Sequence, residues 1–228
     1  MKKKIFIASL VLFLLVGCSG KSENVTESSG ENTTEAADNR VTLDDLAMTE
    51  YKYDSGFGST VYLISVKNNS SQTFNLTANA TAYDASNTML GAADGSIDVI
   101  GPGEESCMFL YFSEVTGIDH ISYKDNVQYS TNIYYQPVIA NLSVQSALNG
   151  NVLVLAVTNN GEVAAEFVEA YAVFLDANNT PLYISSTYIM DAKNVIAPGA
   201  TQSAQIEYYK YDVAFDHVNW YLTGRAEK

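Results

Sequence analysis

Histidine and cysteine, the side chains that most often act as bases, nucleophiles or zinc ligands, are scarce in this chain of 228 residues, which has two of each. His120 and His217 each follow an aspartate and precede a β-branched residue. An Asp-His pair of this kind could titrate near neutral pH or bind a metal ion. A zinc site needs about four nitrogen or sulfur ligands, however. We therefore interpret both pairs as turns that lead into a strand.

Cys107 lies in an apolar, β-rich stretch of the sequence, Ser106 to Phe112. Free cysteine is among the most buried residue types, so we expect a small core residue here rather than a reactive thiol. The sequence contains no Gly-x-Ser-x-Gly, no His-Glu-x-x-His and no Ser-x-x-Lys motif. We therefore expect no catalytic residues, no cofactor and no enzymatic activity.

The acidic segment Asp176-Ala177-Asn178-Asn179-Thr180 has the composition of a calcium-binding loop. An EF-hand loop needs Gly at position 6 and Glu at position 12, where this chain has Pro181 and Thr187. We interpret the segment as a β-turn, which Asp and Asn favour. A calcium site built from carboxylates of several loops stays open as an alternative, because the chain has 26 acidic residues.

Tyrosine is the aromatic residue in excess, with 16 copies. Exposed tyrosines beside Asn and Asp could form a platform for a sugar or a peptide. The alternative is that tyrosine simply suits β-strands. The candidates for a ligand site are the tyrosines near the expected linker or a strand end: Tyr134, Tyr135, Tyr208, Tyr209 and Tyr211. Trp220 lies two residues from an aliphatic residue on either side, so it should face the same side of its strand as they do, and it is expected in the core.

The charge balance excludes nucleic acid as a partner. The chain has 26 acidic and 12 basic residues, for a formal net charge of −14. Binding to phosphates requires clustered Lys and Arg, which this composition does not provide.

The first residues have the organisation of an export signal. Three lysines are followed by an apolar run from Ile5 to Val16, which is too short for a transmembrane helix of about 20 residues. The run ends in Leu15-Val16-Gly17-Cys18, which resembles the lipobox of bacterial lipoproteins. The resemblance implies that residues 1–17 are cleaved off and that Cys18 receives a diacylglycerol. Two acyl chains give stable anchoring, so we expect the protein at the extracytoplasmic face of the cell membrane.

Cleavage would remove three lysines, leaving nine basic against 26 acidic residues and a net charge of −17. Anionic headgroups would repel such a chain, so the lipid on Cys18 would hold it at the membrane. Residues 18–40 are rich in Ser, Glu, Thr and Asn, with little apolar surface to bury. We expect this segment to be a disordered linker.

The remainder of the chain repeats itself. Val61–Asn69 resembles Val152–Asn160, since both are β-rich runs that end in Asn-Asn. Three further landmarks recur in the same order: an apolar or aromatic residue before Asp-Ala, a Pro-Gly pair, and Asp-His. We predict two homologous domains, 41–125 and 137–228, joined by a linker at 126–136.

Within each copy, apolar residues alternate with polar ones, which is the period of a half-buried strand. Ala170, Ala172 and Phe174 are expected on the core face of one strand, and Glu169, Tyr171 and Val173 on its solvated face. Further inward rows are expected at alternate residues from Tyr62 to Val66, Leu76 to Ala82 and Leu153 to Val157. Several short strands without helices predict an all-β fold of two tandem immunoglobulin-like β-sandwiches.

The order of these landmarks resembles the FxLYD domain, an immunoglobulin-like module of extracytoplasmic lipoproteins. The matching segments are Ala80–Asp84 and Ala172–Asp176, and the resemblance covers most of 60–112 and 152–209. Neither copy has the full motif, because the first lacks its Phe and the second lacks its Tyr. The resemblance implies a sandwich fold and a surface location, and it supplies no catalytic residues.

Together these observations predict a membrane-anchored, non-catalytic interaction module. Its expected partner is another cell-surface protein or a cell-wall component. The alternative is a protein that captures a small ligand or a glycan, in a calcium-dependent or calcium-independent way.

Overall fold

The structure, a computed structural model, describes residues 41–228. The expected signal peptide 1–17, Cys18 and the expected linker up to residue 40 lie outside the described residues. Within 41–228 the regular structure is almost entirely β-strand, which confirms the all-β fold class. Three single-turn helices interrupt it, at Leu43–Asp45, Lys124–Asn126 and Ile139–Asn141. No helix in this range is long and apolar enough to cross a membrane.

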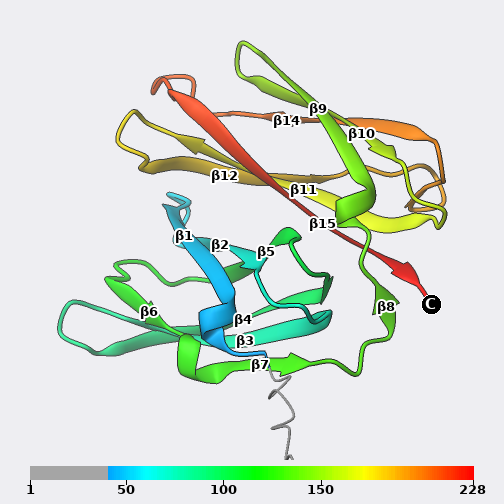
Figure 1. Ribbon diagram of the computed structural model, residues 1–228. Helices are drawn as coiled ribbons and strands as arrows, with labels where there is room; N and C mark the ends of the chain where they lie inside the picture. The colour runs from blue at the N-terminus through cyan, green and yellow to red at the C-terminus, as the bar shows by residue number, and fades with distance from the viewer. Residues whose placement is uncertain (1–40) are drawn as a thin grey trace, which may run out of the picture. The chain divides into compact units, whose positions relative to one another are not determined.

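Strands β1 to β7 form two antiparallel sheets that enclose an apolar core, and we call this part the N-terminal sandwich (Figure 1). Sheet 1 has the order β1-β2-β5. Sheet 2 has the order β4-β3-β6, and β7 also pairs with β3. The strands are β1 Leu46–Asp54, β2 Thr60–Asn68, β3 Phe74–Tyr83, β4 Met89–Ile100, β5 Glu105–Phe112, β6 His120–Ser122 and β7 Val127–Ser130.

Strands β8 to β15 repeat this arrangement, and we call them the C-terminal sandwich. Sheet 3 has the order β14-β10-β9 and sheet 4 the order β12-β11-β15-β8, with β13 also pairing with β11. The strands are β8 Tyr135–Gln136, β9 Leu142–Asn149, β10 Val152–Asn159, β11 Ala165–Leu175, β12 Pro181–Tyr188, β13 Val195–Ile196, β14 Thr201–Glu207 and β15 His217–Glu227. Sheet 3 therefore corresponds to sheet 1, and sheet 4 to sheet 2.

The inward rows predicted from alternation are confirmed. In the N-terminal sandwich, alternate residues of β2 and β3 are buried against each other and against β5. In the C-terminal sandwich, Ala170, Ala172 and Phe174 of β11 are fully buried and pack on Leu153, Leu155 and Val157 of β10. Trp220 is partly buried against the same core, as expected.

The first asparagine of each Asn-Asn pair is a buried structural residue. The Asn159 side-chain nitrogen donates hydrogen bonds to the carbonyls of Val163 and Ile196, both at 2.8 Å, and its Oδ1 accepts one from the Gly161 N–H at 2.9 Å. Asn68 makes the corresponding contacts in the N-terminal sandwich, with Gln72, Ile100 and Ser70. The repeated pair therefore marks a buried polar network that ties a loop to two strands.

A third apolar cluster joins the two sandwiches. It contains Tyr51, Tyr53, Val61, Leu63 and Cys107 from the outer face of sheet 1, and Val173, Leu175 and Ile184 from sheet 4. The Tyr51 and Tyr221 hydroxyls also lie 2.7 Å apart. The outer face of sheet 1 thus packs on the outer face of sheet 4, and the described residues 41–228 belong to one compact unit. That residues 41–125 and 137–228 fold independently stays a prediction.

This packing corrects one expectation about β11. Val173 was predicted to face solvent, but it is fully buried, and Tyr171 is half-buried. The alternation itself is right, since Phe174 and Val173 point to opposite faces. The second face is buried because another sheet covers it, which the period of one strand does not reveal.

A buried carboxylate holds the connection between the sandwiches. Glu104 is 5% exposed, and its two oxygens accept hydrogen bonds from the Gly101 N–H at 2.7 Å and from the Ala140 N–H at 2.8 Å. Ala140 lies between β8 and β9, so one side chain ties a loop of the first sandwich to the entry into the second. The corresponding position in the second copy is Ala200, whose side chain cannot accept a hydrogen bond.

Candidate functional site

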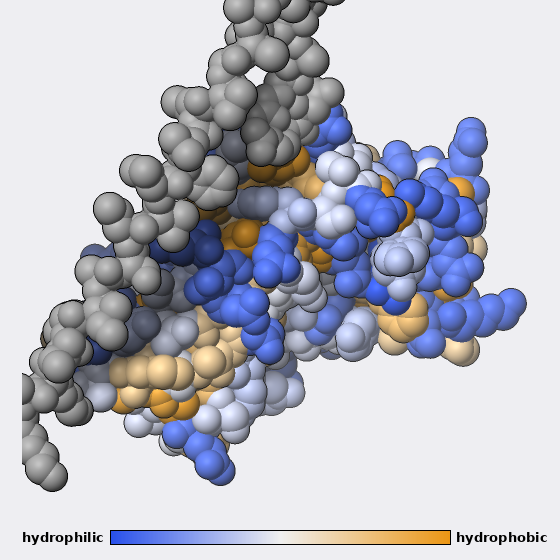
Figure 2. Space-filling model, turned by 90° about the horizontal axis from the view of Figure 1, so that it is seen from below, coloured by the Kyte–Doolittle hydropathy of each residue, from blue (hydrophilic) through white to orange (hydrophobic). Residues whose placement is uncertain are grey.

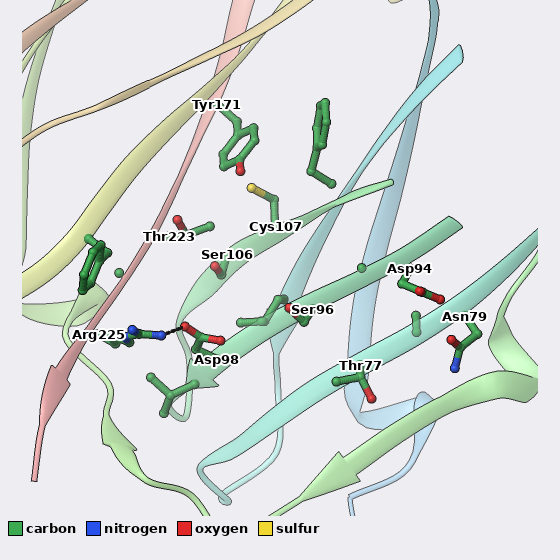
Figure 3. A pocket seen from close by; sticks show the side chains of 17 residues that line it. Thr77, Asn79, Asp94, Ser96, Asp98, Ser106, Cys107, Tyr171, Thr223 and Arg225 are labelled. Atoms are coloured by element: carbon green, nitrogen blue, oxygen red, sulfur yellow. Dashed lines mark hydrogen bonds and ion pairs between the residues drawn. The ribbon is translucent and has the colours of Figure 1, made fainter. Parts of the chain in front are cut away.

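The described residues contain a cavity of about 460 Å³ where the two sandwiches meet (Figure 3). Strands β3, β4 and β5 supply one side of this inter-sandwich groove, and β11 and β15 supply the other. Its polar side chains are Thr77, Asn79, Asp94, Ser96, Asp98, Ser106, Thr223 and Arg225, and its aromatic side chains are Phe109, Phe167 and Tyr171.

The polar floor of the groove follows from strand register. Asn79 of β3 pairs with Asp94 of β4, and Thr77 pairs with Ser96. These residues alternate with the buried alanines of β3, so they must point away from the core. All four are exposed. The result is a carboxylate, a carboxamide and two hydroxyls on adjacent strands, a set that can donate and accept several hydrogen bonds to one bound molecule.

Arg225 closes one end of the groove. Its guanidinium forms an ion pair with Asp98 of the other sandwich, which Figure 3 shows. It also lies 3.9 Å from the ring centroid of Tyr135 and 4.9 Å from that of Phe167. Its Nε atom is buried and has no hydrogen-bond partner among the described residues. The guanidinium is therefore fixed by one charge and two rings, and Tyr135 supports it rather than facing a ligand.

Phe167 reaches the groove because of a β-bulge. Two residues of β11, Phe167 and Val168, stand opposite the single residue Gly224 of β15. Phe167 adopts φ +49°, in the left-handed region that non-glycine residues rarely occupy, and its side chain is exposed. Bulges redirect side chains beside functional sites, and backbone in a sparsely populated region costs about 1–3 kcal/mol. A strained backbone thus presents an apolar ring beside Arg225.

Tyr171 and Cys107 lie at the upper end of the groove, as Figure 3 is drawn. Burial, followed by the nearby Glu169 and Glu105 charges, raises the pKa of the Cys107 thiol well above its ordinary value. Burial and Glu169, which accepts a hydrogen bond from the Tyr171 hydroxyl at 2.9 Å, likewise raise the pKa of Tyr171. Both groups therefore stay protonated at neutral pH, and Cys107 is the buried, unreactive residue that was predicted.

The structure separates the five candidate tyrosines. Tyr208 is buried in the core, where its ring packs on Phe174 at 5.1 Å. Tyr209 and Tyr211 are exposed and adjacent, with ring centroids 6.4 Å apart. Tyr134 is exposed, and Tyr135 stacks on Arg225 beside the far end of β15. The five tyrosines therefore do not lie together, and Tyr209 and Tyr211 form an adjacent exposed pair.

The Asp-His pairs and the acidic segment have the local structures predicted for them. His120 and His217 each lie 3.0 Å from the preceding aspartate, and they begin β6 and β15. Asp176 accepts hydrogen bonds from the N–H groups of Asn178 and Thr180, both at 2.8 Å, so the segment is a turn closed by its own side chain. Within residues 41–228 no cluster of three or more His, Cys, Asp or Glu is placed to hold a metal ion.

Sequence reasoning missed the residues of the groove itself. Asp94 and Asp98 stand out as charges at alternate positions of a strand, which was a usable signal of an exposed face. Arg225, the partner of Asp98, lies 127 residues further along the chain. Only the packing of one sandwich on the other brings these groups together.

No family model matches the chain, and no curated protein matches it. Among solved structures, the chain is similar to red sea bream transglutaminase, with 14% identity and a TM-score of 0.25. That match covers 81% of this chain and 29% of the transglutaminase chain, so the chain spans less than a third of that protein's length. A TM-score this low does not indicate a shared fold.

Proposed function

We propose that this chain is a non-catalytic binding protein, held by a lipid on Cys18 at the extracytoplasmic face of a bacterial cell membrane. The inter-sandwich groove is the observation that carries the proposal. It is concave, it combines polar groups with aromatic rings, and it forms only where the two sandwiches meet. These are the features of a ligand site rather than of a structural surface. In this proposal both sandwiches are FxLYD-type modules.

Binding, rather than catalysis, is supported by the chemistry of the groove. Neither of the two histidines lines it, and its cysteine is a buried thiol with a raised pKa. A nucleophile needs an adjacent base or a lowered pKa, and the groove residues supply neither. The groove instead contains hydrogen-bonding side chains, the Arg225–Asp98 ion pair and aromatic rings.

A groove suits this protein better than a flat docking surface. On the face in Figure 2, hydrophobic residues form separate patches among hydrophilic ones, not one continuous area. Large exposed apolar patches mark flat interaction surfaces, and the described residues in view in Figure 2 do not form one. A partner that inserts a polar segment into the groove, such as a loop of a surface protein or a strand of the cell wall, fits the arrangement.

A glycan is the second candidate ligand, and the paired side chains on the groove floor favour it. Asn79 and Asp94 lie side by side on adjacent strands, where a carboxamide and a carboxylate can bind neighbouring hydroxyls of one sugar ring. The exposed rings of Phe109 and Phe167 provide apolar faces for the carbon side of a sugar.

Retention of the purified chain on isolated peptidoglycan sacculi tests binding to the cell wall. Asp94→Ala and Asn79→Ala each remove one floor hydrogen-bonding group, and each is expected to weaken retention about tenfold, since a hydrogen bond to a charged or polar group contributes roughly 1–3 kcal/mol. Asp212→Ala, an exposed aspartate outside the groove, is the matched control. Equal retention of all three variants would contradict a groove ligand in the cell wall.

The anchor has its own test. Cys18→Ser is expected to release the protein from the membrane fraction or to leave it unprocessed, because serine cannot form the thioether. Metabolic labelling with a radioactive fatty acid measures lipidation of the wild-type chain directly. A wild-type chain that never takes up the label would overturn the anchoring proposal.

A further inference from the structure

The C-terminal sandwich has a sheet that is almost free of charge. Residues 126–161 contain no Asp, Glu, Lys or Arg, although charged residues make up 17% of the chain. This segment includes β9 and β10 entirely, and β14 adds only Glu207 to sheet 3. The negative charges on the rest of this protein would repel another acidic molecule. An uncharged sheet does not add to that repulsion, so an acidic molecule can approach it.

Strand β9 is the open edge of this sheet. Sheet 3 has the order β14-β10-β9, and no described strand pairs with the far side of β9. Proteins protect such edges with charged residues or proline. The corresponding edge strand β1 carries Glu50, Lys52 and Asp54, whereas the eight residues of β9 include no charge and no proline.

The turn at the end of β9 defines which backbone groups point outward. Asn149 pairs with Val152 across a two-residue turn in which Gly150 has φ +60°. Residues that flank such a turn exchange both of their backbone hydrogen bonds, and the bonds then alternate along the ladder. Leu142, Val144, Ser146 and Leu148 therefore direct their N–H and C=O groups to the open edge.

The side chains of these same residues lie on the core side of the sheet. Leu142 and Val144 pack against the core of the C-terminal sandwich. Leu148, at the other end of β9, is 48% exposed. The end of β9 therefore carries an apolar side chain, on the core side of the sheet, that this sandwich leaves exposed.

We propose that β9 pairs with β9 of a second copy of this chain, in an antiparallel register centred on Gln145. In this register Leu142 lies opposite the partner's Leu148, and Gln145 lies opposite its own copy. The exposed Leu148 of each copy is covered by Leu142 of the other copy. The outward N–H and C=O groups of the two edges form hydrogen bonds with each other, and no charged side chains lie opposite one another. Sheet 3 becomes one continuous sheet with three strands from each copy. A second copy is favoured over an unrelated extended peptide because β9 itself supplies an uncharged strand, with an apolar Leu142 at the position opposite the exposed Leu148.

Cysteine crosslinking of the full-length chain in native membranes tests this register. Gln145→Cys places two thiols opposite each other in a pair whose Cα atoms lie about 4.5 Å apart, within the range for a disulfide. Mild oxidation is expected to convert most of this variant to a dimer that a reductant reverses. Ser143→Cys, on the same face of the same strand, is the matched control: its two thiols would lie about 13 Å apart, too far to join. The wild-type chain controls for Cys107 and Cys18.

Two further variants test whether strand pairing causes the crosslink. Ser146→Pro removes one outward N–H, and Leu148→Lys adds a charge at the open edge, while neither changes the ladder with β10. Each is combined with Gln145→Cys, and each is expected to lower the dimer about tenfold while leaving the circular dichroism spectrum unchanged. The proposal is overturned if Gln145→Cys gives no dimer, if Ser143→Cys gives as much, if both edge variants leave the dimer intact, or if the crosslinked product contains a different protein.

Discussion

The buried asparagines show how one side chain can maintain a loop in both copies of a duplicated fold. Asn68 and Asn159 are almost completely buried, and each bonds two carbonyls and one N–H. A buried polar group that loses its partner costs about 1–3 kcal/mol, so these networks make the loops sensitive to a single change.

Replacing Asn159 tests this role. Asn159→Ala leaves the carbonyls of Val163 and Ile196 without their donor and is expected to lower the free energy of unfolding by about 2–3 kcal/mol. Asn160→Ala, its exposed neighbour, is expected to cost less than about 0.5 kcal/mol. Urea denaturation of the two variants measures the difference. Equal costs would show that the buried network contributes little to stability.

Two aspartates in equivalent turns are expected to make the free energy of unfolding depend on pH in the acid range. Backbone hydrogen bonds, chiefly from Thr88 and Thr180, lower the pKa of Asp84 and Asp176 below the ordinary value of 3.8. A carboxyl with a lowered pKa in the folded state stabilises the fold above the unfolded pKa, and the stabilisation is lost as the pH falls through the folded pKa. The double variant Asp84→Asn/Asp176→Asn keeps an acceptor oxygen at each turn but cannot titrate. Unfolding free energies measured between neutral pH and strong acid are expected to fall less steeply for this variant below about pH 4. An unchanged slope would contradict the assignment.

Strand β11, like β2, has both of its faces buried, and in β11 this holds at the C-terminal end of the strand. Phe174 faces the core of its own sandwich, and Val173 faces the other sandwich. The equivalent strand β3 has Thr81 where β11 has Val173, and its outer face is polar. The two sandwiches therefore differ at the positions that decide which sheet face is covered.

A matched pair of substitutions tests this difference. Val173→Ala is expected to cost about 2–3 kcal/mol, from roughly 0.8 kcal/mol for each buried methylene plus the cavity that is left. Thr81→Ala, at the equivalent position of β3, is expected to cost less than about 0.5 kcal/mol. Thermal or urea unfolding of the whole chain compares them. A Val173→Ala variant as stable as Thr81→Ala would mean that sheet 4 does not depend on its contact with sheet 1.

The sequence was sufficient to predict the strands, their inner faces and the repeat, because alternation and turn residues are local signals. It was not sufficient to predict that Val173 is buried, since a strand's own period shows two faces but not what covers the second one. Arg225 and Asp98 were missed for the same reason, because their contact depends on the packing of two sheets that are distant in sequence. The difference between Val173 and Thr81 was the available signal, and comparison of the two copies could have found it.

For the whole molecule, the packing of the two sandwiches is head-to-tail. Sheet 1 of the first copy meets sheet 4 of the second, so sheet 2 and sheet 3 keep uncovered outer faces. A contact of this type can continue indefinitely unless the remaining faces differ from the joined ones. They do differ: sheet 3 has Ala147 and Gln205 where sheet 1 has Tyr51 and Phe109. The outer face of sheet 3 therefore lacks the aromatic side chains through which sheet 1 contacts sheet 4.

The central claim is that this groove binds the partner, and site-specific photo-crosslinking on intact cells tests it most directly. A benzoyl-phenylalanine placed at Phe167 points into the groove, and one placed at Tyr211 reports on the exposed tyrosine pair outside it. We expect a discrete crosslinked product from position 167 that Asp94→Ala removes, and no such product from position 211. A product from position 211 without one from position 167 would contradict the account and assign binding to the tyrosines.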